Sequence, residues 1–136
     1  MTGSAFRIRQ AALDVLVAHA RSELPAECCG LLIGAGATIE EAVRAHNLAG
    51  SPTRFLLDPK DHIDARREAR RRGLDVLGFY HSHPRSPAFP SPIDIAEASY
   101  PDAVYLIVSL EGAVAETRLF QLDGDTATEL PLVAVP

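Results

Sequence analysis

Hydrophobic and polar residues along the chain follow two periods, one of about two residues and one of three to four. Short apolar or alternating runs bounded by turn residues are typical of β-strands. Such runs cover residues 6–9, 28–33, 38–46, 54–57, 74–80, 103–110, 114–122 and 126–133. Turn residues such as Gly34-Ala35-Gly36 and Asp123-Gly124-Asp125 separate neighbouring runs, so we expect antiparallel hairpins.

The first segment with helical periodicity is 10–22, which places Ala12, Leu16 and His19 on one face. Leu24-Pro25 follows and predicts the end of this helix, because a residue before proline disfavours helical backbone. A histidine on an apolar helix face is typical of a hydrogen-bonded core residue. We therefore expect His19 to be structural rather than a metal ligand.

A second helix is indicated by Asp58 as an N-cap residue, Pro59 at the first helical position and Gly73 as a stop signal. His62, in its first turn, is expected to be exposed. This helix carries arginines at positions 66, 67, 70, 71 and 72. Because acidic residues are interspersed nearby, we interpret them as a solvated helix face rather than a nucleic-acid surface.

Strands and helices thus alternate along a chain of 136 residues, which is the usual size of one domain. Some strand pairs must be antiparallel, so the pattern predicts an α/β layered fold, a single mixed β-sheet flanked by helices. We expect one domain over residues 1–136, without repeats or linkers.

The composition is that of an ordinary globular protein, with 47% hydrophobic and 23% charged residues. The formal net charge of −5 argues against nucleic acid as the main partner, because phosphate binding needs a basic surface. The longest apolar runs are too short to cross a membrane. Homodimer formation is left open.

The start of the chain and its cysteines indicate a cytoplasmic protein. Met1 to Ala5 lacks the charged start and long apolar stretch of a signal peptide. The only cysteines, Cys28 and Cys29, are adjacent and too few for a disulfide framework, which fits a reducing compartment. We expect Cys29 to be a small buried residue near the candidate chemistry described next.

Candidate chemistry is concentrated after the apolar run 74–80, where His81 and His83 are two residues apart. In an extended chain, residues two apart point to the same face, so both imidazoles can converge on one ion. An isolated H-x-H pair is often coincidental, however, and needs a further ligand in a defined place.

A third ligand is supplied by the segment from Ser91 to Asp94. Ser91 is a good N-cap, Pro92 suits the first helical position, and we expect a short helix over residues 92–99 with Asp94 in its first turn. Prolines at 84, 87, 90 and 92 stiffen the connection from the histidines. Two imidazoles and one carboxylate suit a catalytic zinc ion, which leaves a fourth position for water.

These residues resemble a known family signature. His81-Ser82-His83-Pro84, the seven residues from Pro84 to Pro90, and Ser91-Pro92-Ile93-Asp94 match the H-x-H-x7-S-x2-D pattern of the JAMM (MPN+) metallopeptidases. The segment from Pro25 to Gly34 looks like the family's upstream glutamate and strand. The resemblance runs from about Ile8 to Leu119 and implies a curved sheet with helices, akin to the cytidine-deaminase architecture.

The resemblance also implies roles for individual residues. His81, His83 and Asp94 would hold one Zn²⁺ per chain, Glu27 would act as general base and then acid, and Ser91 would help to bind the oxyanion. Small bacterial members look like peptidases or isopeptidases that act on the Gly-Gly tail of ubiquitin-like sulfur-carrier proteins or their cysteine adducts. Such a tail, as substrate partner, could add to the sheet as a strand.

Two other functions are compatible with parts of this pattern. The first is a non-catalytic MPN scaffold, which is disfavoured because all five motif positions are present. The second is a role associated with DNA repair, because RadC-like proteins carry a similar pattern. The acidic chain and the lack of an obvious DNA-binding extension argue against it.

Overall fold

The alternating runs form one mixed sheet of eight strands in a computed structural model, which describes residues 5–136. The strands are β1 (Phe6–Arg9), β2 (Cys29–Ala35), β3 (Thr38–Ala45), β4 (Asp75–His83), β5 (Val104–Ser109), β6 (Glu116–Asp123), β7 (Thr126–Leu130) and β8 (Leu132–Val135). Their order in the sheet is β7-β6-β5-β4-β2-β3-β1-β8. β4 pairs in parallel with β5 and antiparallel with β2, so the predicted α/β mixed sheet is confirmed.

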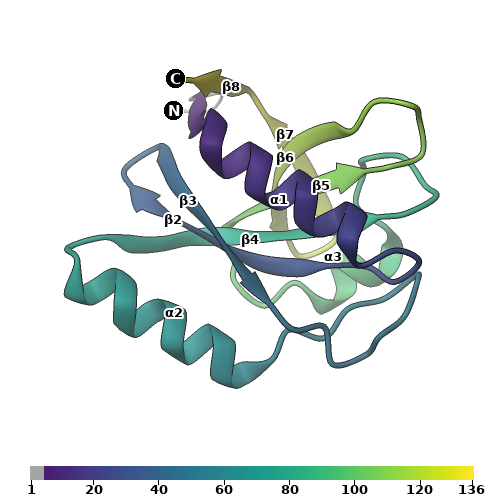
Figure 1. Cartoon of the computed structure of the whole chain (residues 1–136), viewed down its shortest axis with the longest axis horizontal. Coiled ribbons are helices and arrows are strands. Elements are labelled where there is room, and N and C mark those ends of the chain that lie inside the picture. The colour runs from purple at the N-terminus through teal and green to yellow at the C-terminus, as the bar shows by residue number, and fades with distance from the viewer. Residues whose placement is uncertain (1–4) are drawn as a thin grey trace.

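Within the described residues, three helices accompany the sheet, namely α1 (Gln10–Ser22), α2 (Pro59–Arg71) and α3 (Pro92–Glu97). α1 and α2 lie on opposite sides of the sheet (Figure 1). Each covers its own apolar core, one containing Leu16 of α1 with Tyr80, the other containing Ala65 of α2 with Phe79. The long helices therefore bury both faces of the central strands.

The alternation of side chains along β4 decides where the candidate chemistry lies. Tyr80 belongs to the core beneath α1, whereas Phe79 belongs to the core beneath α2. His81 and His83 share the parity of Phe79, so they lie on the α2 face of the sheet. Ser82, between them, points to the opposite face and is fully buried.

The last two strands occupy opposite ends of the strand order, although only Pro131 separates them in the chain. Consecutive Cα atoms are about 3.8 Å apart. The two edges of the sheet must therefore approach each other here, which makes the sheet strongly curved, as expected. The Phe6 amide donates to the Pro131 carbonyl at 2.9 Å and fastens β1 beside this junction.

Several predicted boundaries were wrong. The predicted last strand, 126–133, is two strands, because Pro131 interrupts it. Residues 54–57 form only an isolated bridge between Leu57 and Asn47, and α3 ends at Glu97 rather than at residue 99. The predicted cap is confirmed, since the Asp58 carboxylate accepts from the Lys60 amide at 2.9 Å.

The structure tests the expectations about membrane spans and a signal peptide only in part. Within residues 5–136, no helix combines the length and the apolarity needed to cross a membrane. The signal-peptide expectation concerns Met1 to Ala5, of which only Ala5 lies among the described residues. A cytoplasmic location stays a prediction.

Tyr80 and His19 form a polar pair inside the core beneath α1. The Tyr80 hydroxyl lies 2.7 Å from Nδ1 of His19, and both side chains are buried. Gly30 of β2 leaves the space that the tyrosine ring fills, because a Cβ there would lie 2.3 Å from a ring carbon. The prediction that His19 is a satisfied core histidine is confirmed.

We expect Tyr80→Phe to lower the free energy of unfolding by about 1–3 kcal/mol, because it leaves a buried imidazole nitrogen without its partner. Urea denaturation of the variant and the wild type measures the difference. Tyr100→Phe is the matched control, since Tyr100 is 44% exposed. An equal loss in both variants would contradict the importance of the buried pair.

Stability should also depend on the protonation of His19, because burial lowers the pKa of this side chain below its ordinary value of 6.5. Below about pH 6.5, the unfolded chain binds a proton at His19 that the folded protein excludes, so the free energy of unfolding decreases as pH falls. Urea denaturation at pH 7.5 and 5.5 should show a smaller decrease for His19→Gln than for wild type. Equal decreases would exclude His19 as a contributor.

Candidate metal centre

Both candidate histidines lie at the end of β4, as predicted, because the strand extends to His83. The predicted strand, 74–80, was therefore too short at its carboxyl end. His81 pairs with Cys29 of β2 and with Ile107 of β5, so neighbours on both sides hold its backbone. A central strand of this kind presents the two imidazoles on one face with little freedom.

Asp94 reaches the same place from the first turn of α3. The helix begins with a capping box in which Ser91 Oγ accepts from the Asp94 amide at 3.0 Å. In return, the Ser91 amide donates to Asp94 Oδ2 at 2.9 Å. The cap fixes the carboxylate orientation before any other partner is considered.

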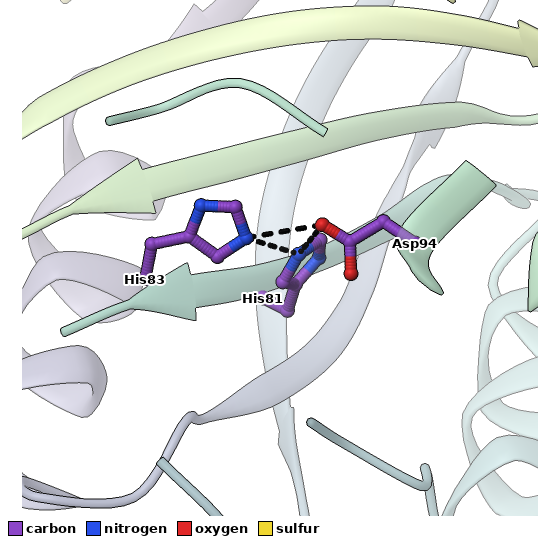
Figure 2. Close-up of side chains that lie close together, drawn as sticks. All are labelled: His81, His83 and Asp94. Atoms are coloured by element: carbon purple, nitrogen blue, oxygen red, sulfur yellow. Dashed lines mark hydrogen bonds and ion pairs between the residues drawn. The ribbon is translucent and has the colours of Figure 1, made fainter. Parts of the chain in front are cut away.

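The three donor atoms converge as Figure 2 shows. Oδ2 of Asp94 lies 3.1 Å from Nε2 of His81 and 3.0 Å from Nε2 of His83, and the two nitrogens are 3.2 Å apart. Ligand atoms at tetrahedral positions around one zinc ion, with bonds of about 2.0–2.1 Å, lie about 3.3 Å from each other. The observed triangle therefore has the size that a zinc site requires.

The protonation of two of the three ligands, Asp94 and His81, suits metal binding. Burial alone would raise the pKa of Asp94, but the hydrogen bonds with His81 and His83 outweigh it and hold this pKa well below its ordinary value. Burial lowers the pKa of His81, which favours the neutral ring. An ionised carboxylate and a neutral imidazole are the forms that bind a metal ion. Burial would lower the pKa of His83, but its hydrogen bonds with Asp94 and Pro87 outweigh burial and raise this pKa.

The proline-rich connection orients the second histidine. Nδ1 of His83 lies 2.8 Å from the Pro87 carbonyl, to which it donates, so Nε2 is the nitrogen directed at the other two ligands. Ser109 of β5 donates its hydroxyl to the Ser86 carbonyl at 2.6 Å, and Ala88 is buried. The connection is thus anchored to the sheet, as expected of a stiff loop.

Glu27 lies two residues before β2 and is only 3% exposed. Continuing the β2–β4 register by two residues brings it opposite His83. Among the described residues, its Oε1 is buried without a hydrogen-bond partner. Burial raises its pKa to about 8. The charge of His83 lowers this pKa, and the charge of Asp94 raises it. An orphaned carboxyl beside converging ligands is a typical feature of a functional site.

The remaining residues near the site have structural contacts. Ser91 Oγ serves the cap of α3, and its hydroxyl hydrogen is not used by that bond. Cys29 is fully buried, with Sγ 3.5 Å from the His46 carbonyl. Burial raises the pKa of Cys28 to about 11 and that of Cys29 to about 12, so both remain thiols near neutral pH.

A cavity of about 600 Å³ adjoins the triangle and includes His81 and Asp94 in its wall. Phe55 stacks on the His81 ring, with centroids 4.5 Å apart. The expectation that His62 is exposed was wrong, because its ring packs edge-on against Phe79 and Tyr100, at 5.3 and 5.7 Å between centroids. The sequence did not lead us to expect Phe55 beside the metal ligands. The one available signal was an aromatic residue next to a polar loop.

A second group of ligand-type atoms is formed by His46, Asp58 and Asp61 at the start of α2. Asp58 is occupied as the helix cap, and Asp61 Oδ2 accepts from both the amide and Nδ1 of His46. The His46 side chain is 82% exposed. Ordinary capping contacts account for this group.

Comparison with known proteins decides the family. Residues 9–123 match the model of the family described as prokaryotic homologs of the JAB domain. The chain belongs to this family. The predicted resemblance is thereby confirmed.

Two proteins similar to this chain are named as enzymes. The desampylase of Haloferax volcanii is 38% identical over 119 residues, which cover 82% of this chain and 86% of that protein. The CysO-cysteine peptidase of Mycobacterium tuberculosis is 32% identical over 131 residues, covering 94% and 90%. At the level of reaction class, the prediction of a peptidase is confirmed by these relatives.

Solved structures confirm the fold. A protein from Desulfitobacterium hafniense has a TM-score of 0.88 at 33% identity, covering 96% of this chain and 92% of its own. A JAB1/MPN domain protein from Archaeoglobus fulgidus has a TM-score of 0.62 at 22% identity, covering 96% and 100%. The JAB-type α/β architecture predicted from the sequence is therefore correct.

The geometry predicts which residues bind the metal. Wild-type protein incubated with zinc and then desalted should retain about one ion per chain. Asp94→Asn should weaken zinc binding by more than about a hundredfold, because even outer-shell partners account for 10–100-fold. Asparagine keeps an oxygen for the Ser91 amide, so α3 should still form. Metal analysis and zinc titration provide the measurements.

Asp61→Asn is the control for the zinc prediction, because it alters the other group of ligand-type atoms. It should leave the zinc content unchanged. Loss of zinc from Asp61→Asn, with retention by Asp94→Asn, would place the metal at the start of α2 and refute the assignment.

Proposed function

We propose that this chain is a zinc-dependent peptidase that hydrolyses the amide bond at the Gly-Gly tail of a ubiquitin-like sulfur-carrier protein or its cysteine adduct. The observation that carries the proposal is the buried triangle of His81, His83 and Asp94 with Glu27 beside it. The names of the two relatives, a desampylase and a CysO-cysteine peptidase, support this substrate class.

His81, His83 and Asp94 are proposed as the protein ligands of the ion. The donor set of two nitrogens and one oxygen is that of many catalytic zinc sites, and it leaves one position open. When bound, zinc supplies a Lewis acid and makes hydroxide available near neutral pH. The chain's own residues then have to place the substrate and move protons.

Glu27 is proposed as the residue that moves the proton. Its carboxyl takes a proton from the attacking water and delivers it to the nitrogen of the departing amine. Burial raises its pKa to about 8, so the group can both accept and release a proton near neutral pH. Because Oε1 has no protein partner among the described residues, it is available to the water and the amine.

Ser91 is proposed to donate its hydroxyl hydrogen to the oxygen that becomes negative during the reaction. Its Oγ already accepts from the Asp94 amide, and this bond leaves the hydroxyl hydrogen available to donate. The cap therefore fixes the position of the oxygen in advance, and a donor held in place before the reaction stabilises developing charge effectively.

The cavity beside His81 is proposed to receive the carrier tail. Its wall includes Phe55, Phe79 and Tyr100 together with the Arg54–Glu97 ion pair. A mixed apolar and polar wall suits an extended peptide with side chains before the two glycines. The scaffold and DNA-repair alternatives gain no support from the named relatives, both of which are enzymes.

The test uses a carrier-type protein ending in Gly-Gly, joined by an amide bond either to cysteine or to a lysine side chain of a reporter. Zinc-loaded protein should release the tail with a free Gly-Gly carboxylate, detected by intact mass spectrometry. A fusion with Gly-Gly replaced by Ala-Ala measures dependence on the tail. Equal cleavage of all fusions would reject the proposed substrate class.

Glu27→Gln should lower kcat by about 10²–10⁴-fold, because glutamine cannot carry the transferred proton. Zinc content should remain that of wild type, since Glu27 is outside the ligand triangle. Glu23→Gln, at a neighbouring exposed glutamate, is the matched control and should keep wild-type activity. Undiminished activity of Glu27→Gln would exclude this residue as the proton carrier.

A further inference from the structure

Glu27 lies outside the strands, so the regular ladder between β2 and its neighbours does not position it. On one side, the adjoining Cys28 is bound to β4, because its amide donates to Ser82 Oγ at 2.8 Å and its carbonyl accepts from the Ser82 amide at 3.1 Å. On the other side, Glu27 is held by the loop of residues 47–57. The Glu27 amide donates to the Ser51 carbonyl at 2.8 Å.

The side chain of Asn47 completes this attachment. Its Nδ2 donates to the Glu27 carbonyl at 2.9 Å and to the Arg54 carbonyl at 3.2 Å. Its Oδ1 accepts from the Ala49 amide at 3.0 Å and the Leu56 amide at 2.9 Å. These four bonds use both donors of the amide and both lone pairs of its oxygen. If the side-chain amide of Asn47 were turned over, its NH2 group would face the Ala49 and Leu56 amides, and its oxygen would face the two carbonyls. The surrounding backbone therefore determines which way the amide points.

The same amide controls Phe55. Arg54 and Leu56, the residues on either side of it, are the ones that bind Asn47. Phe55 is thereby held where its ring stacks on His81 and forms part of the cavity wall. One side chain thus connects the candidate base and the wall beside a candidate ligand.

The neck of the 47–57 loop does not need Asn47 for closure. The Leu48 amide donates to the Leu56 carbonyl at 2.8 Å, and the Asp58 amide donates to the His46 carbonyl at 3.0 Å. The Asn47 side chain adds three bonds within the loop and one bond to Glu27, which lies outside it. The bond to Glu27 is not one of the bonds that close the loop.

We propose that Asn47 is a positioning residue that fixes Glu27 and Phe55 relative to the ligand triangle; this inference rests on the function proposed above. Asn47 touches neither the ion nor the reacting bond. It acts through the Glu27 carbonyl, which sets the direction from which the carboxyl enters the site. A displacement of about 1 Å in a reacting group can cost on the order of a hundredfold in rate.

Asn47→Asp is the principal variant. It retains an oxygen for the Ala49 and Leu56 amides but removes the donors to Glu27 and Arg54. We expect kcat to fall by about tenfold or more, while KM changes by less than about threefold and zinc stays at wild-type content. A purely structural role would lower stability without lowering kcat in folded, zinc-loaded protein.

Two further variants make the comparison specific. Asn47→Ala removes all four bonds without adding charge, so a similar fall in kcat excludes an effect of the new carboxylate. Thr53→Ala removes a side-chain contact with Ser51 inside the same loop and should keep wild-type kcat. A kcat within twofold of wild type in folded Asn47→Asp and Asn47→Ala would overturn the proposal.

Hydrogen exchange separates this inference from the proposed function. In zinc-loaded protein, Asn47→Ala should accelerate exchange of the Glu27 and Leu56 amides by about tenfold or more, and Thr53→Ala should not. If wild type cleaves no Gly-Gly fusion, the proposed function fails and the exchange result alone decides the positioning role. Unchanged exchange at Glu27 would then overturn it.

Discussion

Asp94 places an ionised carboxylate in a buried position between the imidazoles of His81 and His83. Its side chain is only 7% exposed, so the charge is separated from water and must be compensated locally. Three partners meet on one oxygen, two ring nitrogens and the Ser91 amide. The site can exist only if a strand and a helix deliver these groups to the same point.

The sheet and the proline-rich connection satisfy that requirement in different ways. β4 lies between β2 and β5, so its backbone bonds on both sides and its alternating side chains are constrained. α3 is too short to be stable alone, but its capping box and the anchored loop before it define its start. The rigid backbone of the strand and the loop thus positions the three side chains of the triangle.

A second layer of contacts holds the residues that lie outside regular structure. Glu27 precedes β2, and Phe55 lies in a loop, yet both face the same site. Asn47 joins them with a side chain whose polar atoms are all used. The candidate base and Phe55 are therefore held by hydrogen bonds of the Asn47 side chain, which no strand ladder supplies.

The sequence alone determined much of this description, because local rules link it directly to geometry. Residues two apart in a strand share a face, which predicted the convergence of His81 and His83. A serine at the N-cap, a proline at the first helical position and an aspartate at the third predicted α3 and the place of Asp94. Periodicity predicted α1 and most strands, and the cap and stop residues Asp58, Pro59 and Gly73 predicted α2, so the mixed sheet with helices followed.

Only the tertiary structure decided features that depend on partners distant in the chain. The orphaned carboxyl of Glu27, the stacking of Phe55 on His81 and the partial burial of His62 arise from such contacts. The predicted last strand is divided at Pro131 into β7 and β8, which lie at opposite ends of the strand order. This division depends on the curvature of the whole sheet. Local propensity cannot report these, because each results from the packing of segments that meet only in the folded chain.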